Sequence, residues 1–144
     1  MSASQECVIC KLLAGELEVS MVHQDELCSA FMDIQPVNRG HLLIVPNRHM
    51  SDASSLEDAE SARMFVVAQR VARALRKSGV KCEGINFFLA DGEAAGQEVF
   101  HVHLHIFPRF EGDGFSLNLP PGYKRRPGRK ELDATAEMIR KAIE

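Results

Sequence analysis

The feature that most restricts the fold of this chain is the segment 101–107, where three histidines alternate with single aliphatic residues. Neighbouring side chains of a β-strand point to opposite faces, so the three imidazoles would share one face, with successive rings about 7 Å apart. We therefore expect a strand over residues 100–107, stopped by Pro108, with one face for the core and one for chemistry. The chemical face would carry His101, His103 and His105, and the core face Val102, Leu104 and Ile106.

Three imidazoles on one face suit catalysis because the ordinary pKa of histidine, about 6.5, leaves much of it neutral and nucleophilic at cellular pH. Two alternatives stay open at this point. In the first, the rings only pack, which is disfavoured because buried polar groups without partners are costly. A His-x-His pair on a strand can also bind zinc, and the chain would then be a metallohydrolase. The glycine-containing segment 92–99 just upstream could present backbone N–H groups near Gly96 to an oxyanion.

The rest of the chain alternates short apolar segments with turns. Strands are expected at residues 19–23, 27–32, 42–46 and 85–90, and helices at residues 7–14, 56–78 and 132–143. The helix over 56–78 has the best support, because Met64, Val67, Val71 and Leu75 recur at helical spacing before Gly79. Since the connections are too short for repeated crossover helices, we expect an α+β domain with helices packed on a mostly antiparallel sheet.

Size and charge indicate one soluble domain of 144 residues, with its core over about 5–110 and a C-terminal tail and helix over 111–144. With 17 Lys and Arg against 20 Asp and Glu, the net charge of −3 disfavours nonspecific nucleic-acid binding. No apolar run approaches the roughly 18 residues of a membrane-spanning helix, and no signal-peptide pattern is present. A cytoplasmic protein is therefore expected. A basic cluster at residues 124–130 is interpreted as a solvated loop, with a clamp for a polyphosphate tail as the alternative.

Four cysteines are present, and without a signal peptide they are expected to be reduced thiols. Cys28 and Cys82 are interpreted as small buried hydrophobic residues. Cys7 and Cys10 differ, because two intervening residues allow both sulfurs to bind one tetrahedral metal. A single CxxC is weak evidence until further ligands are found.

The histidine segment resembles the motif of the histidine-triad (HIT) superfamily of nucleotide hydrolases and transferases. Further matches occur in the same order at residues 31–34, 40–49, 96–100 and 108–109, so the resemblance covers roughly residues 7–115. It implies a HIT-like fold. It also implies a homodimer in which the helix over 56–78 and the strand over 85–90 meet their symmetry mates and extend the sheet.

The resemblance implies covalent catalysis by His103, which would attack the α-phosphorus of a purine nucleotide such as an AMP derivative. The nucleotidyl-histidine formed would then be hydrolysed by water. His105 and Gln97 are expected to stabilise the phosphoryl oxygens together with the backbone near Glu98 and Val99, so no catalytic metal is expected. The implied substrate-binding residues are Phe31, Asp33, Ile34, His41, Leu43, Gly96, Gln97, Glu98 and Val99.

Within this set, Asp33 matches a carboxylate that accepts hydrogen bonds from the ribose hydroxyls. Phe31, Ile34 and Leu43 would form the apolar slot for the purine. His41 matches a histidine near the active strand, with a structural role and a phosphate contact as open alternatives.

The same resemblance implies a structural zinc, as in some bacterial-type members of the family. The four matching ligands are Cys7, Cys10, His49 and His101. Two thiolates and two imidazoles fill a tetrahedral zinc and leave no open position, which indicates a role in stability. His103 and His105 would remain for the phosphate.

Two positions depart from the family pattern. Ala90 stands where many members have an amide, which removes one expected contact to sugar or phosphate. Glu98 stands where some branches have a hydroxyl near the leaving group, and its charge would repel an acidic leaving group. We therefore expect a purine nucleotide phosphoramidase or related nucleotidyl hydrolase. The alternatives are a dinucleoside polyphosphate hydrolase and an AMP-binding module with vestigial turnover.

Overall fold

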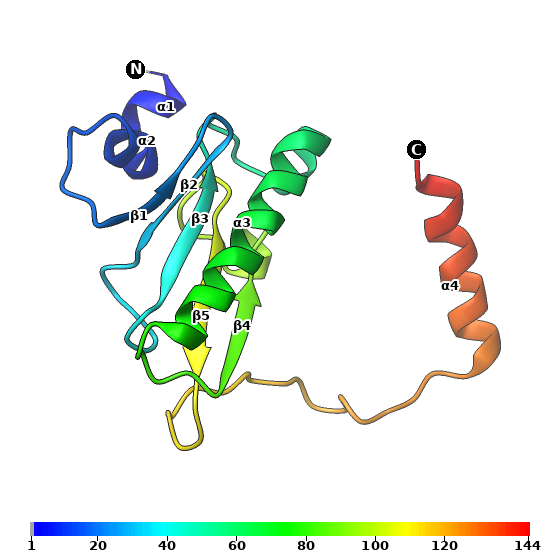
Figure 1. The fold of residues 1–144 in the computed structure, drawn as a ribbon. Coiled ribbons are helices and arrows are strands. Elements are labelled where there is room, and N and C mark those ends of the chain that lie inside the picture. The colour runs from blue at the N-terminus through cyan, green and yellow to red at the C-terminus, as the bar shows by residue number, and fades with distance from the viewer. Residues whose placement is uncertain (1) are drawn as a thin grey trace. The chain divides into compact units, whose positions relative to one another are not determined.

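The fold is described from a computed structural model that covers residues 2–144 (Figure 1). Two compact units result, one ending at Gly114 and the other comprising Phe115–Glu144. The elements in chain order are α1 (Ala3–Glu6), α2 (Val8–Leu13), β1 (Met21–Gln24), β2 (Cys28–Met32), β3 (Leu42–Pro46), the 3-10 helix η1 (Ala53–Ser55), α3 (Asp58–Lys77), β4 (Gly84–Phe88), the 3-10 helix η2 (Glu93–Ala95), β5 (Leu104–Arg109) and α4 (Arg129–Ala142).

All five strands belong to one sheet in the order β1-β2-β3-β5-β4, and each neighbouring pair is antiparallel. The expected α+β class with a mostly antiparallel sheet is confirmed. Most elements lie within two residues of their expected bounds. In these elements the hydrophobic periodicity and the turn residues indicate the same boundaries. The four-residue helix α1 was not expected.

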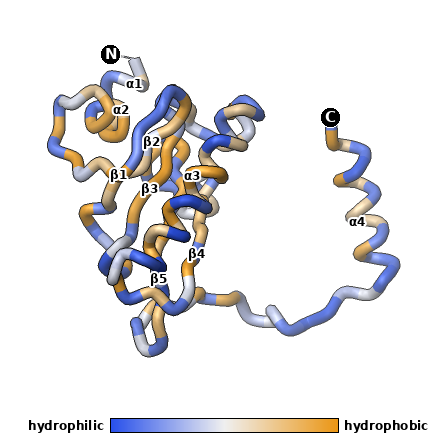
Figure 2. Tube along the Cα trace, viewed as in Figure 1, coloured by the Kyte–Doolittle hydropathy of each residue, from blue (hydrophilic) through white to orange (hydrophobic). Residues whose placement is uncertain are grey.

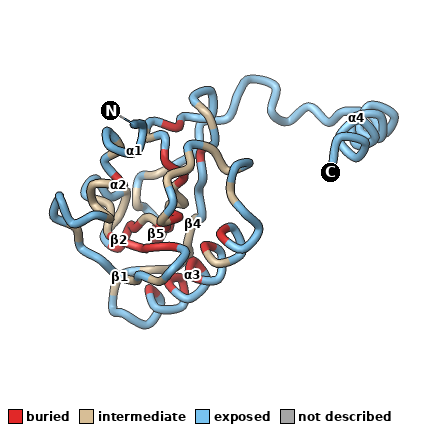
Figure 3. Tube along the Cα trace, turned by 90° about the horizontal axis from the view of Figure 1, so that it is seen from above, coloured by how far each residue is buried: buried red, intermediate tan, exposed pale blue. Residues whose placement is uncertain are grey.

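One face of the sheet is covered by α3, which runs along it in Figure 1. The residues that α3 buries recur at helical spacing, as the sequence pattern predicts, and they pack on aliphatic side chains of β2, β3 and β5. Figure 3 shows buried residues on β2 and on parts of α3. This core contains Cys28, Ala30, Leu42, Ile44, Met64, Val67, Ala68, Val71, Leu75, Val102 and Ile106.

The opposite face of the sheet packs against the short helix α2. β3 is hydrophobic along its length (Figure 2), because both of its faces are covered. Leu42 and Ile44 face α3, whereas Val45 packs with Phe31 and with Ile9 of α2. Alternation along β3 therefore gives the sheet two separate apolar clusters.

The histidine segment is a strand over only part of its length. β5 begins at Leu104, so the expected start at residue 100 is wrong. The ladder between β3 and β5 stops at the pair Ile44 and Leu104. Pro46 has no N–H to continue the ladder, and its carbonyl oxygen accepts a hydrogen bond from the His101 ring. The aliphatic alternation is nevertheless confirmed, because Val102 and the aliphatic residues of β5 pack in the α3 core.

The other end of β5 also differs from expectation, since Pro108 lies within the strand and Arg109 ends it. Pro108 pairs with Ile85 of β4, but its carbonyl oxygen accepts from the side chain of Asn38. Its polar groups therefore face away from β4, and the missing N–H removes no hydrogen bond with that strand.

The second unit consists of an extended segment followed by α4. The expected C-terminal helix is confirmed over Arg129–Ala142, and none of its residues is buried. The basic cluster at residues 124–130 is exposed, with ion pairs from Arg125 to Glu131 at 4.0 Å and from Arg129 to Asp133 at 3.9 Å. Across the described residues, no helix combines the length and apolar character that a membrane crossing requires.

Candidate nucleotide and metal sites

A cavity of about 740 Å³ opens on the α2 face of the sheet. Its position follows from register: Phe31, Leu43 and His105 lie opposite one another on β2, β3 and β5 and so point to the same side. Apolar residues form one part of the wall and histidines another. The lining is Val8, Ile9, Leu12, Leu17, Glu18, Phe31, Met32, Asp33, Ile34, Gln35, His41, Leu43, Gly96, Glu98, Val99, His103 and His105.

The tautomer of neutral His103 follows from its contact with the backbone. Its Nδ1 lies 2.7 Å from the carbonyl oxygen of His101. A carbonyl oxygen only accepts, so Nδ1 carries the proton and Nε2 of the neutral ring keeps its lone pair. Since the side chain lines the cavity, Nε2 is the nitrogen left for a ligand. Neutral His103 is thus prepared to act as a nucleophile or a hydrogen-bond acceptor.

His105 has the opposite polarity, which is set by a relay through His41. The backbone N–H of Val37 donates to His41 Nδ1 at 2.9 Å, so neutral His41 carries its proton on Nε2. That Nε2 lies 2.9 Å from Nδ1 of His105 and donates to it. Neutral His105 therefore carries its own proton on Nε2. The cavity thus presents one imidazole acceptor and one imidazole donor, with the two rings 4.9 Å apart.

Electrostatics keep the relay neutral. Burial lowers the pKa of His105 to about 4, with further lowering by His103 and His41 and opposition from the Asp33 carboxylate. Burial also lowers the pKa of His41, again against the effect of Asp33. At neutral pH both imidazoles are therefore uncharged, and His105 acts as a hydrogen-bond donor and not as a cation.

The CxxC pair converges with two histidines at the edge of the sheet. Ligand atoms of Cys7, Cys10, His49 and His101 all lie within 4.8 Å of one another. The Cys7 Sγ lies 3.5 Å from His101 Nδ1, and the Cys10 Sγ lies 3.4 Å from His49 Nδ1 and 3.5 Å from His101 Nδ1. A tetrahedral zinc, with Zn–S of about 2.3 Å and Zn–N of about 2.0–2.1 Å, has sulfur-to-nitrogen edges of about 3.6 Å. The donor set fits zinc in both chemistry and spacing.

The tautomer of His101 also suits a metal ligand. Its Nε2 lies 2.8 Å from the carbonyl oxygen of Pro46 and donates to it, which leaves the Nδ1 lone pair facing the sulfurs. Burial, together with a hydrogen bond and the charge of Cys7, raises the pKa of the Cys10 thiol to about 11. A bound cation would therefore hold the Cys10 sulfur as a thiolate at neutral pH.

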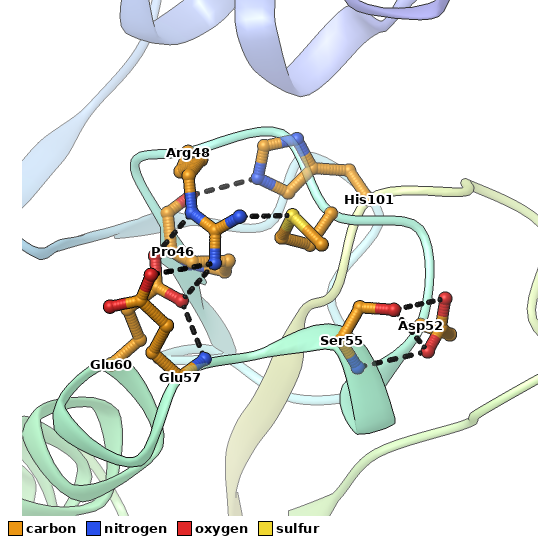
Figure 4. A network of polar contacts seen from close by, with 8 residues as sticks. Pro46, Arg48, Asp52, Ser55, Glu57, Glu60 and His101 are labelled. Carbon is orange, nitrogen blue, oxygen red and sulfur yellow. Dashed lines mark hydrogen bonds and ion pairs between the residues drawn. The ribbon is translucent and has the colours of Figure 1, made fainter.

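The loop that carries His49 is anchored on two sides, and Figure 4 shows the first anchor, the pairing of Arg48 with Glu60. The Arg48 guanidinium donates to both carboxylate oxygens of Glu60 in the first turn of α3, at 3.0 and 2.7 Å. Glu60 is buried, and the hydrogen bonds from Arg48 lower its pKa despite burial. The carbonyl oxygen of Met50 accepts from the backbone N–H of Val102. The loop that carries His49 is thus tied both to α3 and to the histidine segment.

The three histidines do not share one environment, contrary to the expectation of a common strand face. His103 and His105 line the cavity, whereas His101 is fully buried and faces the cysteines. His103 belongs to none of the ligand clusters found among residues 2–144. The alternative of one catalytic metal held by all three histidines therefore does not match the arrangement of donors.

Most of the expected binding residues come together in the cavity. Asp33 uses Oδ1 to accept from the backbone N–H of Gln35, while Oδ2 lies 3.5 Å from His41 Nε2. Ile34 lines the cavity but is 95% exposed, so it provides little of the apolar wall. The other expected residues that line it are Phe31, His41, Leu43, Gly96, Glu98 and Val99.

Gln97 is the expected binding residue that does not line the cavity. It is buried, its Nε2 donates to the carbonyl oxygens of Ser51 and Val99, and its Oε1 accepts from the N–H of Gly92. These bonds use the side chain to hold the loop 92–99. Within residues 2–144 the backbone N–H groups of Glu98 and Val99 have no acceptor.

Sequence reasoning missed the part of the wall that comes from α2 and the loop after it: Val8, Ile9, Leu12, Leu17 and Glu18. A signal was available, because Ile9 and Leu12 are three residues apart in the expected helix 7–14 and so share a face. Nothing in the pattern indicated that this face lines a cavity or that an acidic residue would follow it.

Comparisons with known proteins identify similar sequences and folds. A family profile described as HIT domain matches residues 14–112. The crystal structure of SMU.412c from Streptococcus mutans UA159 is 37% identical and has a TM-score of 0.87, covering 96% of this chain and 86% of that one. A crystal structure described as a Zn-bound histidine triad family protein from Mycobacterium smegmatis is 37% identical with a TM-score of 0.74, covering 97% of this chain and 99% of that one.

A curated relative described as adenylylsulfatase HINT3, from Arabidopsis thaliana, is 32% identical over 108 residues. The match covers 75% of this chain and 54% of the relative.

Proposed function

The chain belongs to the HIT domain family, and from this premise we propose that it is a purine nucleotide phosphoramidase or a related nucleotidyl hydrolase. The observation that carries the proposal is the fixed tautomer of His103, whose Nε2 keeps a lone pair beside an otherwise largely apolar cavity. The similarity to an adenylylsulfatase supports a hydrolytic reaction at a nucleotide phosphorus.

In the proposed reaction, His103 Nε2 attacks the α-phosphorus of the bound nucleotide. The P–Nε2 bond forms as the P–N bond to the amine breaks, and the amine leaves after taking a proton from solvent water. A second water then attacks the same phosphorus and gives one proton back to solvent, the P–Nε2 bond breaks, and the nucleoside monophosphate leaves with neutral His103 restored. The carbonyl oxygen of His101 stabilises the N–H on Nδ1 while the ring is bonded to phosphorus.

The phosphoryl oxygens require donors that are in place before the reaction begins. His105 provides one through Nε2–H, because His41 fixes its tautomer and burial keeps it neutral. The free backbone N–H groups of Glu98 and Val99 provide others. We assign Gln97 the task of positioning this loop. Phe31 and Leu43 would hold the purine, and Asp33 Oδ2 the ribose hydroxyls.

The test is turnover of adenosine 5′-phosphoramidate, followed as AMP release. Parent protein should release AMP, and His103→Ala should lower kcat about a thousandfold or more because it removes the nucleophile. His23→Ala is the matched control, since His23 lies outside the cavity and should leave turnover unchanged. If the folded parent binds AMP but produces none from the phosphoramidate, the protein is an AMP-binding module and the enzyme proposal is refuted.

A preference for amine or neutral leaving groups is supported by charge. The charged side chains lining the cavity are Glu18, Asp33 and Glu98, with no lysine or arginine among the described residues that form it. A polyphosphate leaving group would meet these carboxylates unscreened. Glu98→Ser should therefore raise kcat/KM for a dinucleoside polyphosphate relative to a phosphoramidate, and an unchanged ratio would refute the preference.

We further propose that Cys7, Cys10, His49 and His101 hold a zinc ion. When bound, the metal supplies a cross-link that ties α2 to the loop after β3 and to the histidine segment. Purified protein should contain about one zinc per chain, measured by mass spectrometry of the metal. Cys10→Ser should lose the zinc, whereas Cys82→Ser, which lies outside the cluster, should retain it. Retention by both variants would refute the site.

A homodimer is also proposed, through the free edge of β4 and the outer face of α3. β4 ends the sheet, and Phe87 and Phe88 on it are half-exposed together with Phe65 on α3. The Phe65 and Phe87 rings lie 6.1 Å apart and form one apolar patch. Light scattering should give twice the chain mass, and Phe65→Glu should give a monomer. A monomeric parent at micromolar concentration would contradict the proposal.

A further inference from the structure

A second hollow of about 570 Å³ adjoins the cavity, and the two have part of their lining in common. The two hollows share Phe31, Met32 and Ile34 of the sheet side and Leu12 and Glu18 of the α2 side. No histidine lines the second hollow. The shared residues therefore border both the histidine-lined cavity and a hollow that has no imidazole in its lining.

Glu18 is the acidic residue of this shared set. It lies in the loop between α2 and β1, is exposed, and lines both hollows. Within residues 2–144 its carboxylate has no hydrogen bond and no ion pair. By contrast, Asp33 already accepts from a backbone N–H. Glu18 is thus an unengaged double acceptor on the wall that also contains Phe31, the residue to which we assign the purine when the phosphate is held by His103 and His105.

We infer that Glu18 selects guanine over adenine, an inference that rests on the proposed nucleotide site. An ionised carboxylate only accepts hydrogen bonds. Guanine presents two adjacent donors, N1–H and the 2-amino group, which match the two oxygens of a carboxylate. Adenine presents its 6-amino group beside N1, and the N1 lone pair would face the negative charge. A site built around a hydrogen bond discriminates against the base that leaves it unpaired.

The experiment is calorimetric measurement of Kd for GMP, IMP and AMP with the parent chain, Glu18→Ala and Glu16→Ala. A bidentate contact to a base is worth about 5-fold to 150-fold in discrimination, and solvent exposure places Glu18 at the low end. We expect GMP to bind about fivefold to tenfold more tightly than AMP. IMP, which has N1–H but no 2-amino group, should lie between them.

Glu18→Ala should bring GMP and AMP within about twofold of each other. Glu16→Ala should keep the preference, because Glu16 is an exposed acid two residues away that lines neither hollow. Equal binding of GMP and AMP by the parent overturns the inference about Glu18, and so does a preference for GMP that persists in Glu18→Ala. Neither outcome bears on the proposed function, because turnover dependent on His103 is measured separately. Absence of binding by all three nucleotides overturns both the inference and the proposed site.

Discussion

Acidification should lower the free energy of unfolding, because His105 is protonated more easily in the unfolded chain. The substitution His105→Gln should remove the part of this decrease that is due to His105. The pKa of His105 is about 4 in the folded chain, lowered chiefly by burial, against about 6.5 for an unfolded histidine. Between these values the unfolded state binds more protons, so stability increases with pH. The contribution of His105 is therefore fully present above about pH 6.5 and is lost as the pH falls towards 4.

The magnitude follows from the shift of about 2.5 pKa units, which at 1.36 kcal/mol per unit is worth about 3.4 kcal/mol over the whole window. The linkage relation predicts that His105 lowers the free energy of unfolding by about 2 kcal/mol between pH 7 and pH 5. The side chain is 22% exposed, so solvent screening places the measured value somewhat lower. The groups that set the shift after burial are His103 and His41, which lower the pKa, and Asp33, which raises it.

The assay is urea unfolding at pH 7 and pH 5 for the parent and His105→Gln. Glutamine keeps an acceptor for His41 Nε2–H but does not titrate. Protonation of the cysteine and histidine cluster affects both proteins and cancels in the difference. The parent should lose more stability than the variant between the two pH values, by up to about 2 kcal/mol. Equal losses would refute the assignment of a depressed pKa to His105.

Three further changes probe the scaffold. Ile106→Ala, at a position with no exposed surface, should lower the free energy of unfolding by about 3 kcal/mol in urea titration. Gly40→Ala should destabilise by at least about 1–2 kcal/mol in the same assay, because φ is +99° and the new Cβ would lie 2.9 Å from Val80 Cγ1. His41→Phe should lower kcat about tenfold to a hundredfold with a smaller change in KM, because His105 loses the donor that fixes its tautomer.

The parts of the molecule that the sequence predicts well are those governed by period and turn residues. The helical spacing from Met64 to Leu75 and the alternation of Val102, Leu104 and Ile106 both describe the α3 core. The start of β5 escaped prediction because it depends on Pro46, a residue distant in the sequence, whose carbonyl is taken by the His101 ring. Local patterns do not reveal such long-range competition for a hydrogen bond.

For the candidate site, the sequence predicted which residues come together better than it predicted their contacts and tautomers. The residues inferred from the family resemblance line the cavity or form the cysteine and histidine cluster, apart from Gln97. The tautomers of the histidines could not be predicted from the sequence, because each is set by a carbonyl or N–H group that only folding brings beside the ring. Glu18 was missed for a related reason, since its importance comes from the cavity and from no motif.

The cavity wall is built from two kinds of structure, and this division has a consequence for evolution. The part lined by His103 and His105 stands on or beside hydrogen-bonded strands, where a change disturbs β3, β5 and the α3 core together. Another part of the wall stands on residues 8–18, a six-residue helix and a loop outside the sheet ladder. Descendants of such a chain can therefore change the residues of one part of the cavity while they inherit the two imidazoles of the other part unaltered.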